Sequence, residues 1–122
     1  MNVCCKVWIE HDGENVFGEG RARLLAAIAD TGSLSAAARA LGMPYRTAWK
    51  HLNHMEQGYG RKLVVRQTGG ATGGGCRLTK AGRSLLAGYQ KFHEGLDELL
   101  DERFRRFVKI TSRQAATRRE SV

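Results

Sequence analysis

Hydrophobic and polar residues alternate along this 122-residue chain in patterns typical first of strands and then of helices. Near the start, loosely alternating residues surround Asp12-Gly13, a dipeptide typical of tight hairpins, and predict strands near residues 3–10 and 15–17. The apolar residues that follow have helical spacing and predict a first helix over residues 20–31. The chain is therefore expected to begin with a hairpin and a helix.

The stretch SLSAAARALGMPYRTAWKHLNHME contains two short helical patterns separated by a break. The first pattern covers residues 36–41, follows serines that can cap a helix, and ends at Gly42. Pro44 suits the first turn of a second helix, because its missing N–H group is not needed there. In this second helix the polar side chains face away from a single apolar stripe, which consists of Tyr45, Ala48, Leu52 and Met55.

A second hairpin and a long helix are predicted for the remainder of the chain. The segments KLVVRQ and CRLT are strand-like, and the TGGATGGG between them is too rich in glycine for a regular element. Thr79 can cap a last helix over residues 80–110, whereas residues 111–122 lack periodicity and are predicted to form a disordered basic tail. Apolar residues of the helix follow the seven-residue repeat of a dimerisation helix: Leu85, Tyr89, Phe92, Leu96 and Leu99, continued after a one-residue shift by Phe104 and Phe107.

Two short helices joined by a tight glycine-containing turn form a helix-turn-helix, and a glycine-tipped hairpin after it is a wing. The predicted fold is mainly α with a small β component. It is a winged helix-turn-helix domain over residues 1–110, with an N-terminal β-hairpin and a long C-terminal dimerisation helix. No apolar run can cross a bilayer and no secretory signal is present, so a cytoplasmic protein is expected. The repeat of the last helix predicts a homodimer.

The charge distribution indicates that the middle of the chain binds a polyanion. The formal net charge is +8, and between Thr31 and His93 the only acidic residue is Glu56. The bases of this segment are Arg39, Arg46, Lys50, Arg61, Lys62, Arg66, Arg77, Lys80, Arg83 and Lys91. A basic middle with acids at both ends is typical of a nucleic-acid-binding face.

In a helix-turn-helix the second helix enters the DNA major groove and contacts base edges near its N-terminus. Arginine can contact guanine with two hydrogen bonds and asparagine can do so with adenine. Arg66 and Arg77 of the wing can lie against phosphates or in the minor groove, whereas partial burial is favoured over base contact for Trp49. The candidate base-contacting residues are Tyr45, Arg46, Thr47, Lys50 and Asn53.

Residues 6–92 resemble the N-terminal DNA-binding domain of the molybdate-responsive regulators of the ModE family. The specific motifs are Tyr-Arg-Thr-Ala-Trp at residues 45–49 and the glycine-rich wing that ends in Leu78-Thr79. The helix-turn-helix is also similar to that of LysR-type regulators, which are expected to lack this wing and to have serine at the position of Trp49. The resemblance implies a dimer on a two-fold symmetric operator. It also implies that Ser35, Tyr45, Arg46, Thr47 and Lys50 face DNA and that Thr68, Gly69, Gly70, Gly73, Gly74 and Gly75 belong to the wing.

Members of the resembled family continue into small β-barrel domains that bind molybdate or tungstate, and this chain ends about where those domains would begin. The expectation is therefore a regulator without the molybdate-binding domains and without a cofactor. A constitutive DNA binder, a partner of a separate oxyanion-binding protein and a detector of another signal all remain open. A modulator that heterodimerises with a full-length regulator is a further alternative.

Thiol or metal sensing and catalysis find less support in the sequence. Buried, inert thiols are the default for cysteines, and histidines three residues apart fit a solvated helix face equally well. The residues that leave a sensing role open are Cys4, Cys5, Cys76, His51 and His54. No grouping of nucleophile, base and acid has a recognisable catalytic context, so neither an enzyme nor a metal site is predicted.

Overall fold

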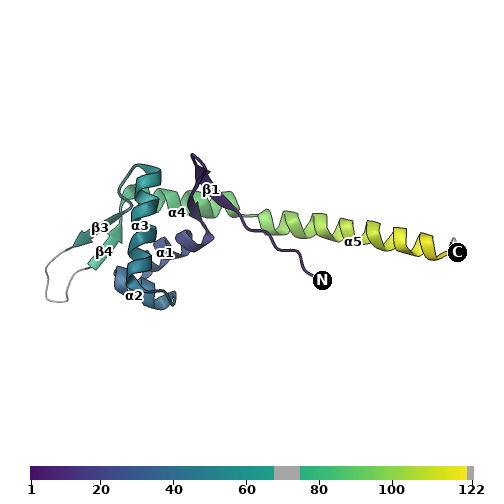
Figure 1. The fold of residues 1–122 in the computed structure, drawn as a ribbon, viewed down its shortest axis with the longest axis horizontal. Coiled ribbons are helices and arrows are strands. Elements are labelled where there is room, and N and C mark those ends of the chain that lie inside the picture. Colours follow the sequence, from purple (N-terminus) through teal and green to yellow (C-terminus); the bar gives the residue numbers. More distant parts are fainter. Residues whose placement is uncertain (68–74, 121–122) are drawn as a thin grey trace. The chain divides into compact units, whose positions relative to one another are not determined.

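The computed structural model describes residues 1–67 and 75–120, with side chains described as far as residue 113 (Figure 1). Contacts divide the chain into two units: Lys6–Lys91, and the terminal segments Met1–Cys5 and Phe92–Val122. Within the described ranges, no helix has both the length and the hydrophobicity of a membrane span.

The chain begins with the predicted hairpin, formed by β1 (Trp8–His11) and β2 (Glu14–Gly18) in antiparallel pairing. Asp12 and Gly13 connect the strands with φ angles of 52° and 80°. Two consecutive left-handed residues form the turn that matches the twist of a two-residue hairpin. β1 begins later than the predicted residue 3, because β2 ends where the first helix begins and leaves the preceding residues without a partner strand.

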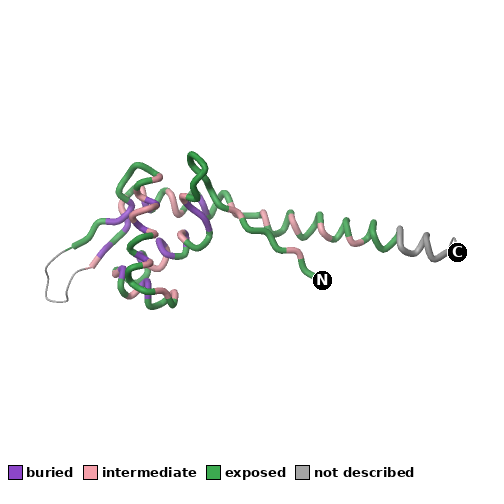
Figure 2. The backbone as a smooth tube through the Cα atoms, viewed as in Figure 1, coloured by how far each residue is buried: buried purple, intermediate pink, exposed green. Residues whose placement is uncertain are grey.

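Three helices enclose the core of the Lys6–Lys91 unit: α1 (Glu19–Thr31), α2 (Leu34–Ala40) and α3 (Tyr45–Tyr59). Figure 2 shows the buried residues gathered where these helices and the second hairpin meet. Complete burial of a leucine or isoleucine side chain contributes about 1.5–3 kcal/mol to folding. The most deeply buried side chains are Leu24, Leu25, Ile28, Met55 and Leu63.

The second hairpin consists of β3 (Val64–Gln67) and β4 (Gly75–Leu78), which pair antiparallel, and α4 (Lys80–His93) follows it. The predicted cap of this helix is confirmed, because the Gly82 N–H donates to Thr79 Oγ1 at 3.0 Å. Capping satisfies a backbone donor that the first turn of a helix leaves unpaired.

The prediction of a single helix over residues 80–110 is wrong, because Gly95 separates two helices in this range. α4 ends at His93, Gly95 has a φ of 82°, and α5 (Leu96–Glu120) begins after it. A left-handed backbone cannot continue a right-handed helix, and glycine adopts that conformation without steric penalty. α5 continues past residue 110 into the predicted disordered tail, where arginine, glutamine, alanine and glutamate favour a helix and no glycine or proline interrupts it.

The predicted dimerisation residues therefore separate into two groups. Tyr89 of α4 is buried, and its ring packs edge-on against Phe17 with 5.1 Å between centroids. Leu85 also packs against this core, so both residues stabilise their own domain. The other predicted residues lie in the terminal unit: Phe92, Leu96, Leu99, Phe104 and Phe107.

Two glycines of α4 are expected to respond in opposite directions to alanine. A Cβ at Gly82 would overlap the backbone oxygen of Leu63, whereas no atom lies within 4 Å of a Cβ at Gly88. We expect Gly82→Ala to lower the free energy of unfolding by about 1–3 kcal/mol through overpacking. Gly88→Ala should raise it by about 0.5–1 kcal/mol through helix propensity. Urea unfolding measures both, and equal effects of the two variants would contradict the close approach of α4 to Leu63.

Candidate nucleic-acid interface

The turn between α2 and α3 sets the geometry of the helix-turn-helix. Ser33 caps α2, because its Oγ accepts from the Ala36 N–H at 3.1 Å. This leaves the exposed Ser35 without a capping role. Gly42 has a φ of 67° at the end of α2, and Pro44 precedes the first residue of α3 in an extended conformation. The predicted break between the two helices is confirmed.

α3 has one face in the core and one face outside. Ala48, Leu52 and Met55 are buried, which confirms most of the predicted stripe. Arg46 and Lys50 are exposed, and neither forms an ion pair or hydrogen bond with the described residues. The remaining candidates are half-exposed or half-buried: Tyr45, Thr47 and Asn53. The base-contacting candidates therefore lie along the accessible side of the helix.

Trp49, for which the sequence favoured partial burial over base contact, also lies on this accessible side. Its exposed fraction is 42%, close to the 49% of Tyr45. Together with Arg46 and Lys50, the two rings line a shallow cavity of about 310 Å³. Trp49 is therefore available to a molecule bound along α3.

The wing places its two arginines on different faces. Arg66 pairs with Cys76 across the strands, and Val65 pairs with Arg77. Side chains of paired residues project to the same face of a hairpin and alternate along each strand. Arg66 therefore shares the face of the buried Cys76, whereas Arg77 lies on the opposite face. The wing-tip candidates Thr68, Gly69, Gly70, Gly73 and Gly74 lie outside the described residues, and Gly75 is the first residue of β4.

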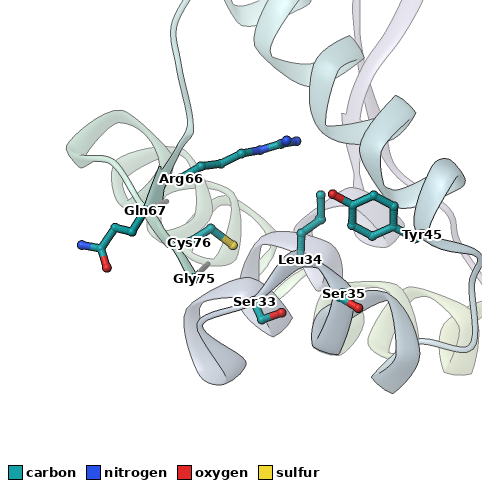
Figure 3. A pocket seen from close by; sticks show the side chains of 8 residues that line it. All are labelled: Ser33, Leu34, Ser35, Tyr45, Arg66, Gln67, Gly75 and Cys76. Atoms are coloured by element: carbon teal, nitrogen blue, oxygen red, sulfur yellow. The ribbon is translucent and has the colours of Figure 1, made fainter. Parts of the chain in front are cut away.

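A pocket of about 200 Å³ lies between the helix-turn-helix and the paired strands of the wing (Figure 3). Arg66 extends from β3 in the direction of Tyr45, and the Tyr45 hydroxyl points toward Leu34. Ser33 and Ser35 line the same pocket. An exposed guanidinium at such a pocket suits an anionic group such as a DNA phosphate.

Three hydrogen bonds from backbone N–H groups of the wing hold it against the helices. The Cys76 N–H donates to the Gly32 carbonyl at 2.8 Å, which joins β4 to the end of α1. The Glu56 carboxylate of α3 accepts from the Leu63 N–H at 2.8 Å and from the Val64 N–H at 3.4 Å. Glu56 thereby anchors the start of β3.

Glu56 is a positioning residue that the sequence analysis identified only as the single acid of the basic segment. Its side chain is 10% exposed and lies 3.7 Å from Lys62 Nζ. Because this carboxylate is turned inward and is paired, it leaves the outer face of α3 positively charged. The position of Glu56 relative to the apolar stripe did not indicate that it would bind the backbone N–H groups of Leu63 and Val64.

His54 of α3 contacts both the N-terminal hairpin and α1. His54 Nδ1 lies 2.7 Å from Arg21 Nη2, and His54 Nε2 lies 3.3 Å from Glu14 Oε2. Burial lowers the pKa of His51, and the charges of Arg21 and His54 lower it further. In the described part of the chain, no three His, Cys, Asp or Glu side chains come together as a metal site. His54 thus connects α3 to α1 and to β2.

The cysteines divide by exposure. Cys4 and Cys5 are exposed, whereas Cys76 is buried at the pocket between the helices and the wing. Burial raises the pKa of the Cys76 thiol, which outweighs the opposite effects of a Leu34 backbone hydrogen bond and the Arg66 charge. A raised pKa keeps the thiol neutral and less nucleophilic at neutral pH.

Comparison with protein families identifies the helix-turn-helix. Residues 20–83 match the family described as bacterial regulatory helix-turn-helix protein, lysR family. The matched range includes both strands of the wing, so the expected absence of a wing does not separate LysR-type regulators from this chain.

Curated relatives with similar sequences include several proteins named for molybdenum. The molybdenum-pterin-binding protein MopB of Rhodobacter capsulatus is 42% identical over 94 residues, which cover 77% of this chain and 34% of that protein. The DNA-binding transcriptional dual regulator ModE of Escherichia coli (strain K12) is 44% identical over 69 residues, covering 57% and 26%. This chain spans about a third or less of the length of these two relatives.

Two solved structures have a similar fold. ArgP from Mycobacterium tuberculosis has a TM-score of 0.53 and 31% identity, covering 69% of this chain and 30% of that one. A CbnR_DBD-DNA complex has a TM-score of 0.53 and 25% identity, covering 80% of this chain and 95% of that one. The Lys6–Lys91 unit therefore has the fold of a DNA-binding domain, with a ModE-like helix-turn-helix.

Removal of the Glu56 carboxylate should loosen the base of the wing. Glu56→Ala leaves two backbone N–H groups without their acceptor, and we expect the free energy of unfolding to fall by about 1–3 kcal/mol. Glu56→Gln keeps one acceptor oxygen and should cost less. Glu19→Ala, which removes an exposed i,i+4 ion pair with Arg23, is the matched control and should change stability by less than about 1 kcal/mol. Urea unfolding that ranked Glu56→Ala with the control would contradict the anchoring role.

Proposed function

The chain belongs to the bacterial regulatory helix-turn-helix proteins of the lysR family, and on that basis we propose that it is a DNA-binding transcriptional regulator of the ModE type. The observation that carries this proposal is the outer face of α3, where Arg46 and Lys50 are exposed and unpaired within the described residues. An unpaired basic face next to a wing fits the phosphates and base edges of duplex DNA.

In this proposal α3 lies in the major groove and contacts bases from its N-terminal end to its middle. Arg46 contacts a guanine through two hydrogen bonds, and Asn53 is placed two turns further along to contact an adenine. Arg66, in the pocket between the helices and the wing, contacts a phosphate of the same half-site. Arg77 lies on the other face of the wing, where its positive charge attracts DNA as it approaches.

We further propose that the protein is a cytoplasmic homodimer joined through α5, so that two copies of α3 contact a two-fold symmetric operator. These apolar residues of α5 fall on one face of the helix and form a single stripe: Leu96, Leu99, Leu100, Phe104, Phe107 and Ile110. Leu99, Phe107 and Ile110 are 45%, 58% and 56% exposed. A second copy would remove this stripe from water.

The charge order of α5 supports antiparallel pairing of two such helices. Acidic residues precede basic ones along the helix, as Asp97, Glu98, Asp101 and Glu102 are followed by Arg103, Arg105, Arg106 and Lys109. An antiparallel partner would place opposite charges side by side. A symmetric dimer also doubles the number of DNA contacts.

The names of the relatives refer to molybdenum transport and molybdenum-pterin binding. We propose that the genes controlled by this protein serve molybdenum metabolism. A separate oxyanion-binding protein is the partner that would supply the signal in this scheme, and no cofactor is assigned to the described residues.

Replacement of arginines should separate base contacts from phosphate contacts. We expect Arg46→Ala to weaken binding to the preferred duplex by about 1–3 kcal/mol and to reduce sequence preference. Arg66→Ala should weaken binding to preferred and scrambled duplexes equally, because a phosphate contact is independent of sequence. Arg23→Ala on α1 removes an exposed arginine that pairs with Glu19, and should leave both affinities unchanged.

Fluorescence anisotropy at one fixed, moderate salt concentration measures these affinities on duplexes selected from a random-sequence pool. A wild-type protein that bound all duplexes equally would contradict the proposed regulator. Equal effects of Arg46→Ala on preferred and scrambled duplexes would contradict its contact with a base.

The dimer should depend on the apolar stripe of α5. We expect the wild type to sediment as a dimer and Phe107→Glu to sediment as a monomer, because a charge would have to be buried in the interface. Ser112→Glu adds the same charge at a polar, exposed position of α5 and should remain dimeric. A wild type that is monomeric at the concentrations that bind DNA would contradict the homodimer.

A further inference from the structure

Two aromatic side chains stand on the surface of α3 among cationic residues. Tyr45 and Trp49 lie four residues apart, which places them on neighbouring turns of the same helix face. They are 49% and 42% exposed, and Arg46 and Lys50 complete the cavity of about 310 Å³ that they line. Two aromatic and two cationic side chains thus line this cavity.

The two rings are not needed to fill the core, because other residues of α3 fill it. Ala48, Leu52 and Met55 occupy the buried side of α3. Tyr45 and Trp49 therefore leave apolar surface in water within the segment whose single acid is Glu56, at an energetic cost that a bound ligand would offset. The Tyr45 hydroxyl points toward Leu34 (Figure 3). The part of Tyr45 that lines the cavity with Trp49 is therefore its aromatic ring.

The ligand that fits such a cavity is apolar at its centre and surrounded by negative charge. In the major groove of duplex DNA, the apolar group presented by a base edge is the 5-methyl group of thymine, and phosphates flank it on both strands. Arg46 and Lys50 can contact those surroundings while the rings cover the methyl group.

We propose that Tyr45 and Trp49 form a binding site for a thymine 5-methyl group, and that Trp49 is a specificity-determining residue. This inference rests on the proposed function, because it requires α3 to lie in the major groove. The operator then carries a thymine at one fixed position in each half-site, next to the base contacted by Arg46. The assignment uses apolar contact alone and involves no hydrogen bond from Trp49.

Deoxyuridine offers a direct test, because it differs from thymidine by the absence of the 5-methyl group. The full chain is used to select a preferred duplex from a random-sequence pool, and each thymine is then replaced singly by uracil. We expect the wild type to lose affinity at one thymine per half-site, by about fourfold for the loss of one buried methyl group. The other thymines should tolerate the replacement.

Variants of the rings locate the methyl-binding site on the protein. Trp49→Ala should bind the thymine and uracil duplexes with equal affinity, and Trp49→Phe should retain part of the difference. Tyr59→Ala is the matched control, because Tyr59 is 47% exposed on the same helix but is its last residue. This control should keep the fourfold difference, and thermal unfolding by circular dichroism confirms that each variant is folded.

The outcomes separate this inference from the proposed function. A preferred duplex that the wild type binds equally well with uracil at every position overturns the methyl-binding site and leaves the regulator intact. A thymine preference that persists in Trp49→Ala overturns the role of Trp49. Tighter binding to the single strand than to the duplex would mean that the rings stack on unpaired bases instead, and no duplex preference at all would overturn both proposals.

Discussion

The burial of one face of α3 is the constraint on which the rest of this structure depends. Leu52 and Met55 are almost completely covered in the core that α1 also fills. Because side chains of a helix have fixed angular positions, burial of this face forces Arg46 and Lys50 outward. The same rotation brings Trp49 to the surface. Core packing and the candidate DNA contacts are thus two consequences of a single helix orientation.

The wing is held in place by contacts at the start of β3 with α3 and with the start of α4. Glu56 accepts backbone N–H groups at the start of β3, and the hydroxyl of Thr79 donates to the Lys62 carbonyl at 2.7 Å. Gly82 allows α4 to approach the backbone of Leu63 closely. These contacts position Arg66 in the pocket beside Tyr45, and they keep the single acid of the basic segment away from the outer face.

Periodicity located the elements well but did not identify what each apolar residue contacts. Leu85 and Tyr89 fit the repeat of a dimer seam, yet they pack in their own domain, Tyr89 against Phe17. The apolar repeat also continues through Gly95. A pattern of hydrophobic residues contains no information about the backbone angles of the residues between them. The left-handed φ of Gly95 ends one helix before the next begins.

The sequence by itself determined the hairpin at Asp12-Gly13, the break at Gly42 and Pro44, and the two faces of α3. Each of these follows from local backbone preference or from the period of a helix, and both depend only on residues that are close in sequence. Only the tertiary structure decided that Arg66 and Arg77 lie on opposite faces of the wing, that Glu56 anchors β3, and that Trp49 is exposed. Those properties depend on strand register and on contacts between residues distant in sequence, and a pattern along the chain does not specify either.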